Sequence, residues 1–246
     1  MRISIGDTPA VLPEKDLEKP TEARMREIKI WDLPTRLFHW CLVALFATSW
    51  ASAEFDYFTV HYYSGYGILT LVLFRLVWGF AGSDTSKLIS YVKSPFTVLR
   101  YMKSLRERKP GDEIGHNPMG GYAVLALLGF LTAQVGTGLF AQDVDFINSG
   151  PLSDMVSFEL GNQASDLHHI LFDFLLIMVG IHLTAIAFHE GYKREGLVRA
   201  MITGWRGYGD KGPTTPPTLV PTSRALFVFI LAVLAMAFIV WILPTL

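Results

Sequence analysis

Apolar residues along the chain gather into five long blocks that are separated by polar stretches. The blocks cover residues 37–53, 60–80, 121–141, 167–188 and 225–243. Most reach the roughly 20 residues that a helix needs to cross about 30 Å of hydrocarbon. One such block could be a buried helix of a soluble protein. Five in succession instead predict an all-α integral membrane protein, built as a helical bundle.

The first block is the shortest, and its flanks decide how it is interpreted. Pro34, Thr35 and Arg36 precede it, and proline suits the first turn of a helix. Ala51-Ser52-Ala53 at its end resembles a signal-peptidase site. A signal peptide begins with a short basic segment, whereas a long segment with several acids comes before this block. We therefore expect a retained membrane helix.

The basic residues are distributed unevenly between the connections. With the N-terminus inside, all 21 Lys and Arg lie on the cytoplasmic side or, for Arg75, near the cytoplasmic end of the second helix. The external connections, 54–59 and 142–166, carry acids and no basic residue. The positive-inside rule predicts a cytoplasmic N-terminus and an external C-terminus.

Overall composition supports the membrane interpretation. Half of the chain is apolar (51%) and only 17% is charged. Soluble domains carry more charge, roughly 25% of their residues. The net charge of −1 indicates no particular partner, and we expect none among nucleic acids.

Composition also divides the chain into four parts. Residues 1–28 are polar with three prolines and are expected to form a flexible cytoplasmic arm. Residues 29–206 hold the first four apolar blocks. A proline-rich linker, 207–222, leads to the fifth transmembrane helix in 223–246.

The internal connection 83–119 contains a candidate surface helix. Pro95 is followed by a stripe of apolar residues at helical spacing, with Arg100, Lys103 and Arg106 elsewhere on the helix. The members of the stripe are Phe96, Leu99, Met102 and Leu105. This mixture suits a helix that lies in the headgroup plane of the membrane. Binding of a partner protein is the alternative.

Histidines within the apolar blocks carry the strongest chemical signal, because ionisable groups inside spanning segments are costly and indicate function. His168 and His182 both lie in the fourth block. At about 100° and 1.5 Å per residue, they differ by about 40° around the helix and about 21 Å along it. One face of this helix therefore presents two imidazoles at two depths.

The other two buried histidines lie level with these. His61 begins the second helix on the outer side, at the depth of His168. His39 lies roughly 21 Å below the outer end of the first helix, close to the depth of His182. We call His61 and His168 the outer pair, and His39 and His182 the inner pair. A single buried histidine could be a packing residue, but two level pairs predict two shared ligands.

Two imidazoles on facing helices suit a haem with two axial ligands. A zinc ion is a poorer match, since no Cys, Asp or Glu lies nearby to complete its shell. Gly65, one turn after His61, could admit the flat macrocycle. Arg75 reaches the depth of the inner pair, where it could meet a propionate or instead extend to the cytoplasmic interface. Arg36 is a weaker propionate candidate.

Three further residues are given structural or peripheral roles. His116 lies before the third helix and is interpreted as a turn or capping residue. His189 follows His182 two helical turns later; it could touch a propionate or a quinone, or lie at the surface. Cys41 is the single cysteine, which excludes an internal disulfide and a cysteine-based metal cluster; it is interpreted as a small apolar residue.

A series of short motifs in a specific order carries a family resemblance. They are WDLPTRLFHW at 31–40, RLVWG at 75–79, GHNPMGG at 115–121, TGLF at 137–140, the two histidines of the fourth block and LVRAMITG at 197–204. Over residues 29–206 the sequence resembles the prokaryotic cytochrome b561 family, which includes the cytochrome b subunits of nickel–iron hydrogenases. The fifth apolar segment departs from the usual four-helix pattern.

The resemblance implies a four-helix core with two haem b groups, ligated by His39, His61, His168 and His182, in a bacterial inner membrane. It also implies electron exchange with a quinone, and with a redox partner such as a cytochrome c or a hydrogenase-like subunit of a respiratory chain. The leading hypothesis is thus an electron-transfer subunit. The alternatives are a free-standing superoxide/quinone oxidoreductase, a transporter that uses histidines to move protons or metal ions, and a non-catalytic membrane anchor.

Overall fold

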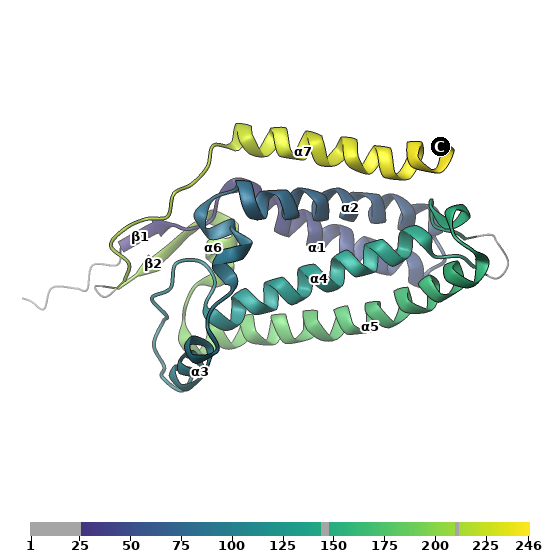
Figure 1. Cartoon of the computed structure of the whole chain (residues 1–246). Coiled ribbons are helices and arrows are strands. Elements are labelled where there is room, and N and C mark those ends of the chain that lie inside the picture. Colours follow the sequence, from purple (N-terminus) through teal and green to yellow (C-terminus); the bar gives the residue numbers. More distant parts are fainter. Residues whose placement is uncertain (1–25, 144–147, 210–211) are drawn as a thin grey trace, which may run out of the picture.

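The computed structural model describes residues 26–143, 148–209 and 212–246, and long helices dominate them (Figure 1). These helices are α1 (Leu33–Glu54), α2 (Phe58–Ala81), α4 (Pro118–Phe140), α5 (Phe158–Phe188) and α7 (Thr222–Ala237). They run side by side, with α7 along the outer face of α2. The prediction of an all-α helical bundle is confirmed.

Four stretches are long and apolar enough to cross a membrane. They are Phe58–Ala81, Pro118–Phe140, Phe158–Lys193 and Thr222–Thr245. α1 spans 22 residues and packs along α2, but Arg36, His39 and several hydroxyl and indole groups make it less apolar than these four. The chain is therefore a multi-pass membrane protein, with α1 as the most polar long helix of the bundle.

Side-chain caps begin the helices where the sequence predicts. The carboxylate of Asp32 accepts a hydrogen bond from the Thr35 amide at 2.7 Å, and Pro34 occupies the first turn of α1. Asn117 accepts from the Gly120 amide in the same way, again with a proline in the first turn of α4. Each cap satisfies an amide that has no partner within its helix.

One helix is longer than its apolar block. α5 begins at Phe158, well before the block at 167, because Ser157 caps it and Glu159 lies in its first turn. Both features stabilise a helix start, and the polar residues that follow tolerate helical geometry. His168 consequently lies almost three turns inside α5, rather than near its end as expected.

The last long helix, α7, packs against the rest of the bundle through α2. Ala225, Val228 and Ala232 of α7 form a buried cluster with Phe74 and Trp78 of α2. The small alanines allow close approach, and Phe229 and Trp241 add ring contacts to Phe74 and Tyr66. The segment ends in a π-helical turn, Phe238–Ile242.

A small assembly of two strands and a short helix closes the end of the bundle at which α1 begins, around a buried cluster that includes Ile28, Ala200 and Tyr208. Strand β1 (Arg26–Lys29) pairs antiparallel with β2 (Trp205–Tyr208), next to α6 (Leu197–Thr203). The expected flexible arm 1–28 thus ends in a paired strand, which the hydrophobic pattern did not reveal; residues 1–25 lie outside the described part. The linker after β2 is held at residues 218 and 220, whose amides donate to Asp84 and Ser83.

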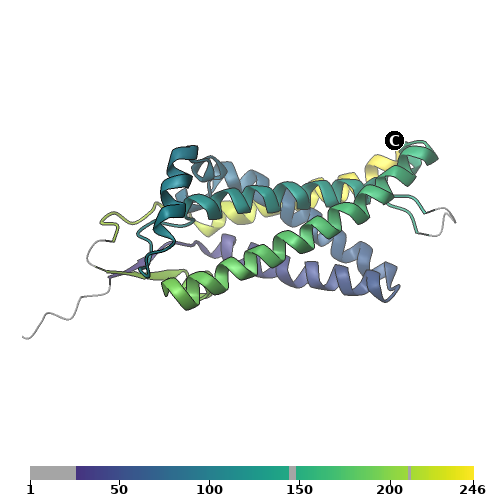
Figure 2. The same cartoon turned by 90° about the horizontal axis from the view of Figure 1, so that it is seen from below.

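A short helix, α3 (Pro95–Ser104), lies across this same end. Its axis is nearly perpendicular to the long helices in both views (Figures 1 and 2). Ser94 caps it and Pro95 occupies its first turn, as the sequence predicts.

Candidate functional site

The structure places the two histidines of the outer pair next to each other. His61, on α2, and His168, on α5, have ring centres 6.2 Å apart with their planes at 80°. Two metal–imidazole bonds of about 2 Å each, together with the ring radii, place ring centres roughly 6 Å apart. The observed separation therefore matches two imidazoles that share one metal atom.

Backbone carbonyls orient both imidazoles of the outer pair. His61 Nδ1 lies 2.9 Å from the Ser49 carbonyl of α1, and His168 Nδ1 lies 2.9 Å from the Gln134 carbonyl of α4. A carbonyl oxygen only accepts, so each Nδ1 carries the proton. Each Nε2 then keeps its lone pair for a metal, the arrangement typical of metal-ligating histidines.

Gly138 of α4 allows His168 to take this position. A Cβ at Gly138 would lie 2.9 Å from Cε1 and 3.1 Å from Nδ1 of the His168 ring, closer than ordinary contacts permit. Gly138 belongs to the TGLF motif at 137–140, and only the structure shows its role. The same holds for Ser49 and Gln134, because backbone acceptors leave no signal in a sequence.

The inner pair lies at the other end of the bundle. His39 belongs to α1 and His182 to α5. Along α5, His182 lies about 21 Å from His168. Nδ1 of His39 is buried and has no hydrogen-bond partner in the described part of the chain. A buried ring nitrogen without a partner fits a histidine whose surroundings are completed by a bound group.

His116 joins the inner pair from the loop before α4. Its ring packs between Trp31 and Tyr91, at centre distances of 4.9 and 4.8 Å. Burial lowers the pKa of His116 to about 3, and the charge of Arg75 acts in the same direction. The charges of His182 and His39 also lower this pKa, so all three histidines lie within electrostatic reach of one another. His116 forms part of the bend, as predicted, but Asn117 supplies the cap.

The predicted supporting residues occupy the expected region. Arg75 is buried and donates to the Ser86 carbonyl at 2.9 Å and to the Tyr91 hydroxyl at 3.0 Å, so it does not extend to water. Arg36 donates to the carbonyl of Ile202. A Cβ at Gly65 would meet nothing within 4 Å, and its contact with a flat ring stays a prediction.

An apolar layer separates the two pairs. Ile68 and Val72 of α2, Leu131 of α4 and Leu175 of α5 form a buried cluster. Leu175 lies midway between His168 and His182 and is only 2% exposed. The described residues hold no cluster of three or more metal-ligating side chains.

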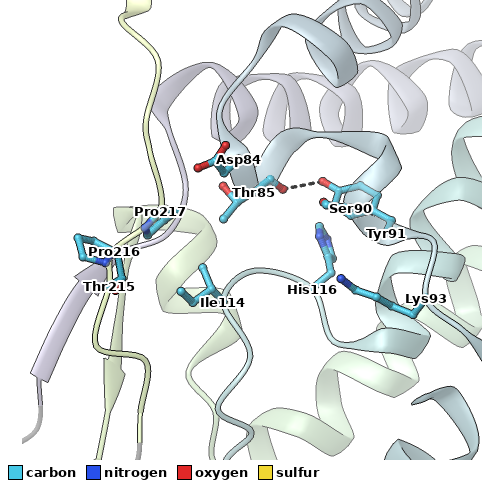
Figure 3. A pocket seen from close by; sticks show the side chains of 10 residues that line it. All are labelled: Asp84, Thr85, Ser90, Tyr91, Lys93, Ile114, His116, Thr215, Pro216 and Pro217. Carbon is cyan, nitrogen blue, oxygen red and sulfur yellow. Dashed lines mark hydrogen bonds between the residues drawn. The ribbon is translucent and has the colours of Figure 1, made fainter. Parts of the chain in front are cut away.

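A pocket of about 320 Å³ opens beside His116 (Figure 3). Thr85, Tyr91, Lys93 and His116 line it together with Pro216 and Pro217 of the linker. The Tyr91 hydroxyl donates to the Thr85 carbonyl at 2.8 Å. The pocket thus offers hydrogen-bonding and cationic groups around His116, contributed by segments that are far apart in the sequence.

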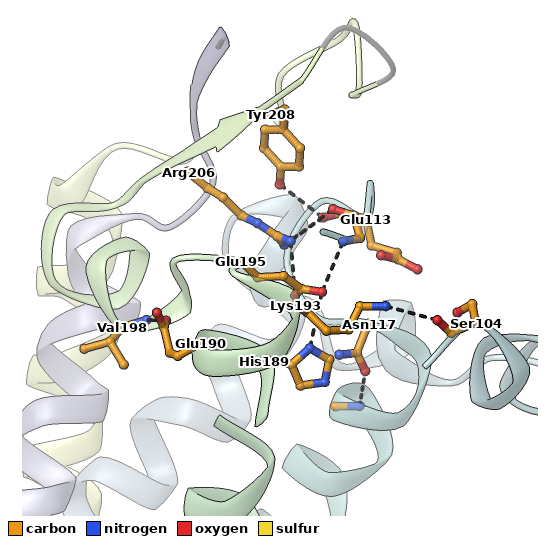
Figure 4. Close-up of polar contacts among 12 residues, drawn as sticks. Ser104, Glu113, Asn117, His189, Glu190, Lys193, Glu195, Val198, Arg206 and Tyr208 are labelled. Atoms are coloured by element: carbon orange, nitrogen blue, oxygen red, sulfur yellow. Dashed lines mark hydrogen bonds and ion pairs between the residues drawn. The ribbon is translucent and has the colours of Figure 1, made fainter. Parts of the chain in front are cut away.

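A buried polar cluster, also missed from sequence, fastens the end of α5 (Figure 4). Glu195 lies 3.2 Å from Arg206 of β2 and 3.2 Å from Nδ1 of His189, and all three side chains are buried. Burial opposes the charge of Glu195, but His189 and Arg206 outweigh it and lower the pKa of this carboxyl. His189 is thus held by Glu195 and is not at the surface.

Known proteins resemble this chain over most of its length. A probable Ni/Fe-hydrogenase B-type cytochrome subunit of Azotobacter chroococcum mcd 1 is 24% identical over 219 residues, which is 76% of this chain and 91% of the relative. Its counterpart in Azotobacter vinelandii is 23% identical over the same shares. The subunit of Cupriavidus necator is 25% identical over 74% of this chain and 87% of its own.

No solved structure matches the chain significantly. The family model described as prokaryotic cytochrome b561 matches residues 30–204, which include all four paired histidines. The chain therefore belongs to the prokaryotic cytochrome b561 family and is a membrane b-type cytochrome of electron transfer.

Proposed function

We propose that this protein carries two haem b groups, one at each histidine pair, and passes electrons between a quinone and a redox partner protein. The observation that carries the proposal is the outer pair: two imidazoles 6.2 Å apart, each with Nδ1 bonded to a carbonyl. Bound haem iron would supply the one-electron step, while the chain supplies ligation, orientation and tuning.

The residues of the chain have separate tasks in this proposal. Ser49 and Gln134 fix the tautomers of the outer pair through their carbonyls. Arg75 contributes a buried positive charge near the inner pair, where it would favour the reduced state of a redox group. Arg36 and Gly65 are proposed to contact haem, as a propionate partner and as the residue beside the ring face.

The proposed partners follow from the relatives and from the pocket. The named relatives are probable hydrogenase cytochrome subunits, so a hydrogenase-like subunit is the proposed redox partner; a cytochrome c is the other candidate. The pocket that Tyr91 and His116 line is the proposed place for the quinone headgroup, because its polar groups could bond quinone oxygens. We further propose a bacterial inner membrane, with the N-terminus inside.

A dithionite-reduced minus oxidised spectrum with haem quantitation per chain tests the proposal. We expect a low-spin b-type signal and two haems per chain. A colourless protein after expression with ample haem would reject it, as would a single haem bound through other side chains. Rapid superoxide consumption by the purified chain would instead favour the free-standing oxidoreductase.

His189→Ala provides a control for the assignment of ligands. In the structure His189 contacts Glu195, not the paired histidines, so the variant should keep both haems. Loss of the inner haem in this variant would contradict the pairing of His39 with His182.

A further inference from the structure

Helix α3 presents an unusual surface for a segment at the end of a membrane bundle. Phe96 is 80% exposed and Leu99 is 56% exposed, and Met102 is exposed as well. Ile89 and Val92, just before the helix, extend this apolar surface. Large apolar side chains gathered on one face indicate contact with another apolar phase.

The positive charges of α3 lie beside this apolar surface. At about 100° per residue, Met102 and Leu99 lie between the buried Tyr101 and the cations Lys103 and Arg100. One side of the helix therefore packs on the protein, the next is apolar and exposed, and the third carries the two cations with Phe96 between them. This order is that of a helix at a membrane surface.

Contacts to α4 place α3 at the depth where a spanning helix begins. The Tyr122 hydroxyl, in the first turns of α4, donates to the Lys93 carbonyl at 2.7 Å, just before α3. Met119 and Tyr122 are themselves exposed on that part of α4. The start of α3 is thus tied to the level at which α4 meets the lipid.

Contacts to the turn His189–Lys193, which directly follows α5, hold the other end of α3 (Figure 4). The buried Lys193 donates to the Ser104 carbonyl at 3.2 Å, at the last residue of α3. Tyr192 donates to the Arg106 carbonyl at 3.0 Å. With both ends held in this way, α3 lies across the axis of the bundle (Figure 2), the direction expected of a helix that follows a bilayer surface.

We propose that α3 is an interfacial helix that buries Leu99 and Met102 in the bilayer and binds anionic phospholipid headgroups through Arg100 and Lys103. Charge complementarity favours this occupant, because α3 contains no acidic residue to offset its cations. Each Lys or Arg near an anionic membrane surface strengthens the attraction about fivefold. This role is independent of haem binding.

Site-directed labelling in vesicles tests the depth of α3. In a background with Cys41, the single cysteine, changed to alanine, Leu99→Cys and Met102→Cys would each carry a nitroxide label. Asp112→Cys, in the exposed loop after α3, is the aqueous control. In vesicles of phosphatidylcholine and phosphatidylglycerol, the α3 labels should collide with dissolved oxygen more than with a water-soluble nickel complex. Accessibility equal to that of Asp112→Cys would overturn the proposal.

The headgroup preference is tested by charge removal. Arg100→Gln with Lys103→Gln should lower the selectivity for spin-labelled phosphatidylglycerol over phosphatidylcholine by about fivefold per charge. Lys29→Gln with Lys109→Gln removes two exposed charges outside α3 and should leave the selectivity unchanged. Equal losses in both double variants would overturn the assignment to α3. If the nitroxide labels on α3 become protected from the nickel complex only after a soluble protein is added, a protein covers this face. That result would overturn the assignment to lipid.

Discussion

The outer and inner histidine pairs differ in how the protein surrounds them. In the outer pair, both imidazoles are held by backbone carbonyls, and Gly138 provides the close fit of one ring. In the inner pair, Nδ1 of His39 has no partner among the described residues, and the surroundings include Arg75 and His116. One site is formed by rigid main-chain contacts, and the other by a polar environment beside a pocket.

This difference bears on electron flow. A carbonyl that accepts from a ligating imidazole makes that ligand more basic, which favours oxidised iron. A buried arginine near the other site favours the reduced form. We therefore expect the inner haem to have the higher potential, so that electrons pass more readily from the outer to the inner pair.

The largest expected effect comes from removing one ligand. His168→Ala should abolish haem binding at the outer pair and leave the inner haem, halving the haem content per chain. His182→Ala is the matched variant for the inner pair. Haem quantitation and redox titration of each variant should show one component, with the higher potential in His168→Ala. Loss of both haems in either variant would contradict independent pairs.

Glu195→Gln is expected to weaken the inner end of the bundle selectively. It leaves buried Arg206 without its ionic partner, and breaking a buried pair costs about 3 kcal/mol. The folded pKa of Glu195 is lowered. Its stabilisation is therefore present above the unfolded pKa of about 4 and is lost as the pH falls through the folded value. Thermal melts followed by haem absorbance should show earlier release of the inner haem. Equal shifts for both haems would mean that the cluster supports the whole bundle.

Gly138→Ala tests the close fit at the outer pair. The added methyl group would displace His168, and loss of such supporting geometry costs roughly 10–100-fold in metal affinity. Gly129→Ala is a suitable control on the same helix, since a Cβ there meets nothing within 4 Å. Competition with a haem-binding apoprotein would measure both affinities. Similar affinity in the two variants would show that His168 does not need this glycine.

The smallest expected effect is a shift in the midpoint potential of the inner haem. Arg75→Gln removes the buried charge near the inner pair, and such a charge contributes roughly 1 kcal/mol at protein dielectric values. The midpoint of the inner haem should fall by some tens of millivolts, with the outer midpoint nearly unchanged. Arg224→Gln, at the start of α7, is the control. A shift in the midpoint potential of the outer haem alone would show that Arg75 acts on the outer pair and not on the inner pair.

The local sequence pattern was sufficient to predict the helices of the bundle. Helix existence follows from block length and from caps such as Asp32 with Pro34, which act within one turn. The pairing of His61 with His168 could be predicted because both the period and the rise of a helix are constant. The start of α5 at Phe158 was missed, since a capped polar extension does not add to an apolar block.

Contacts between distant segments required the tertiary structure. The pairing of β1 with β2 joins segments from opposite ends of the chain, and two four-residue strands leave almost no periodic signal. The Gln134 carbonyl that orients His168 belongs to the backbone, which every residue type shares. The Glu195–Arg206 contact was likewise unforeseeable, because charge alone does not show which partner lies nearby.

The sequence by itself thus determined a membrane bundle with histidines at two levels, because helical geometry converts residue spacing into depth and direction. Only the tertiary structure decided what surrounds each pair: carbonyls and Gly138 at the outer one, Arg75 and His116 at the inner one. Those neighbours come from helices and loops whose relative placement depends on packing, and packing is a property of the whole fold.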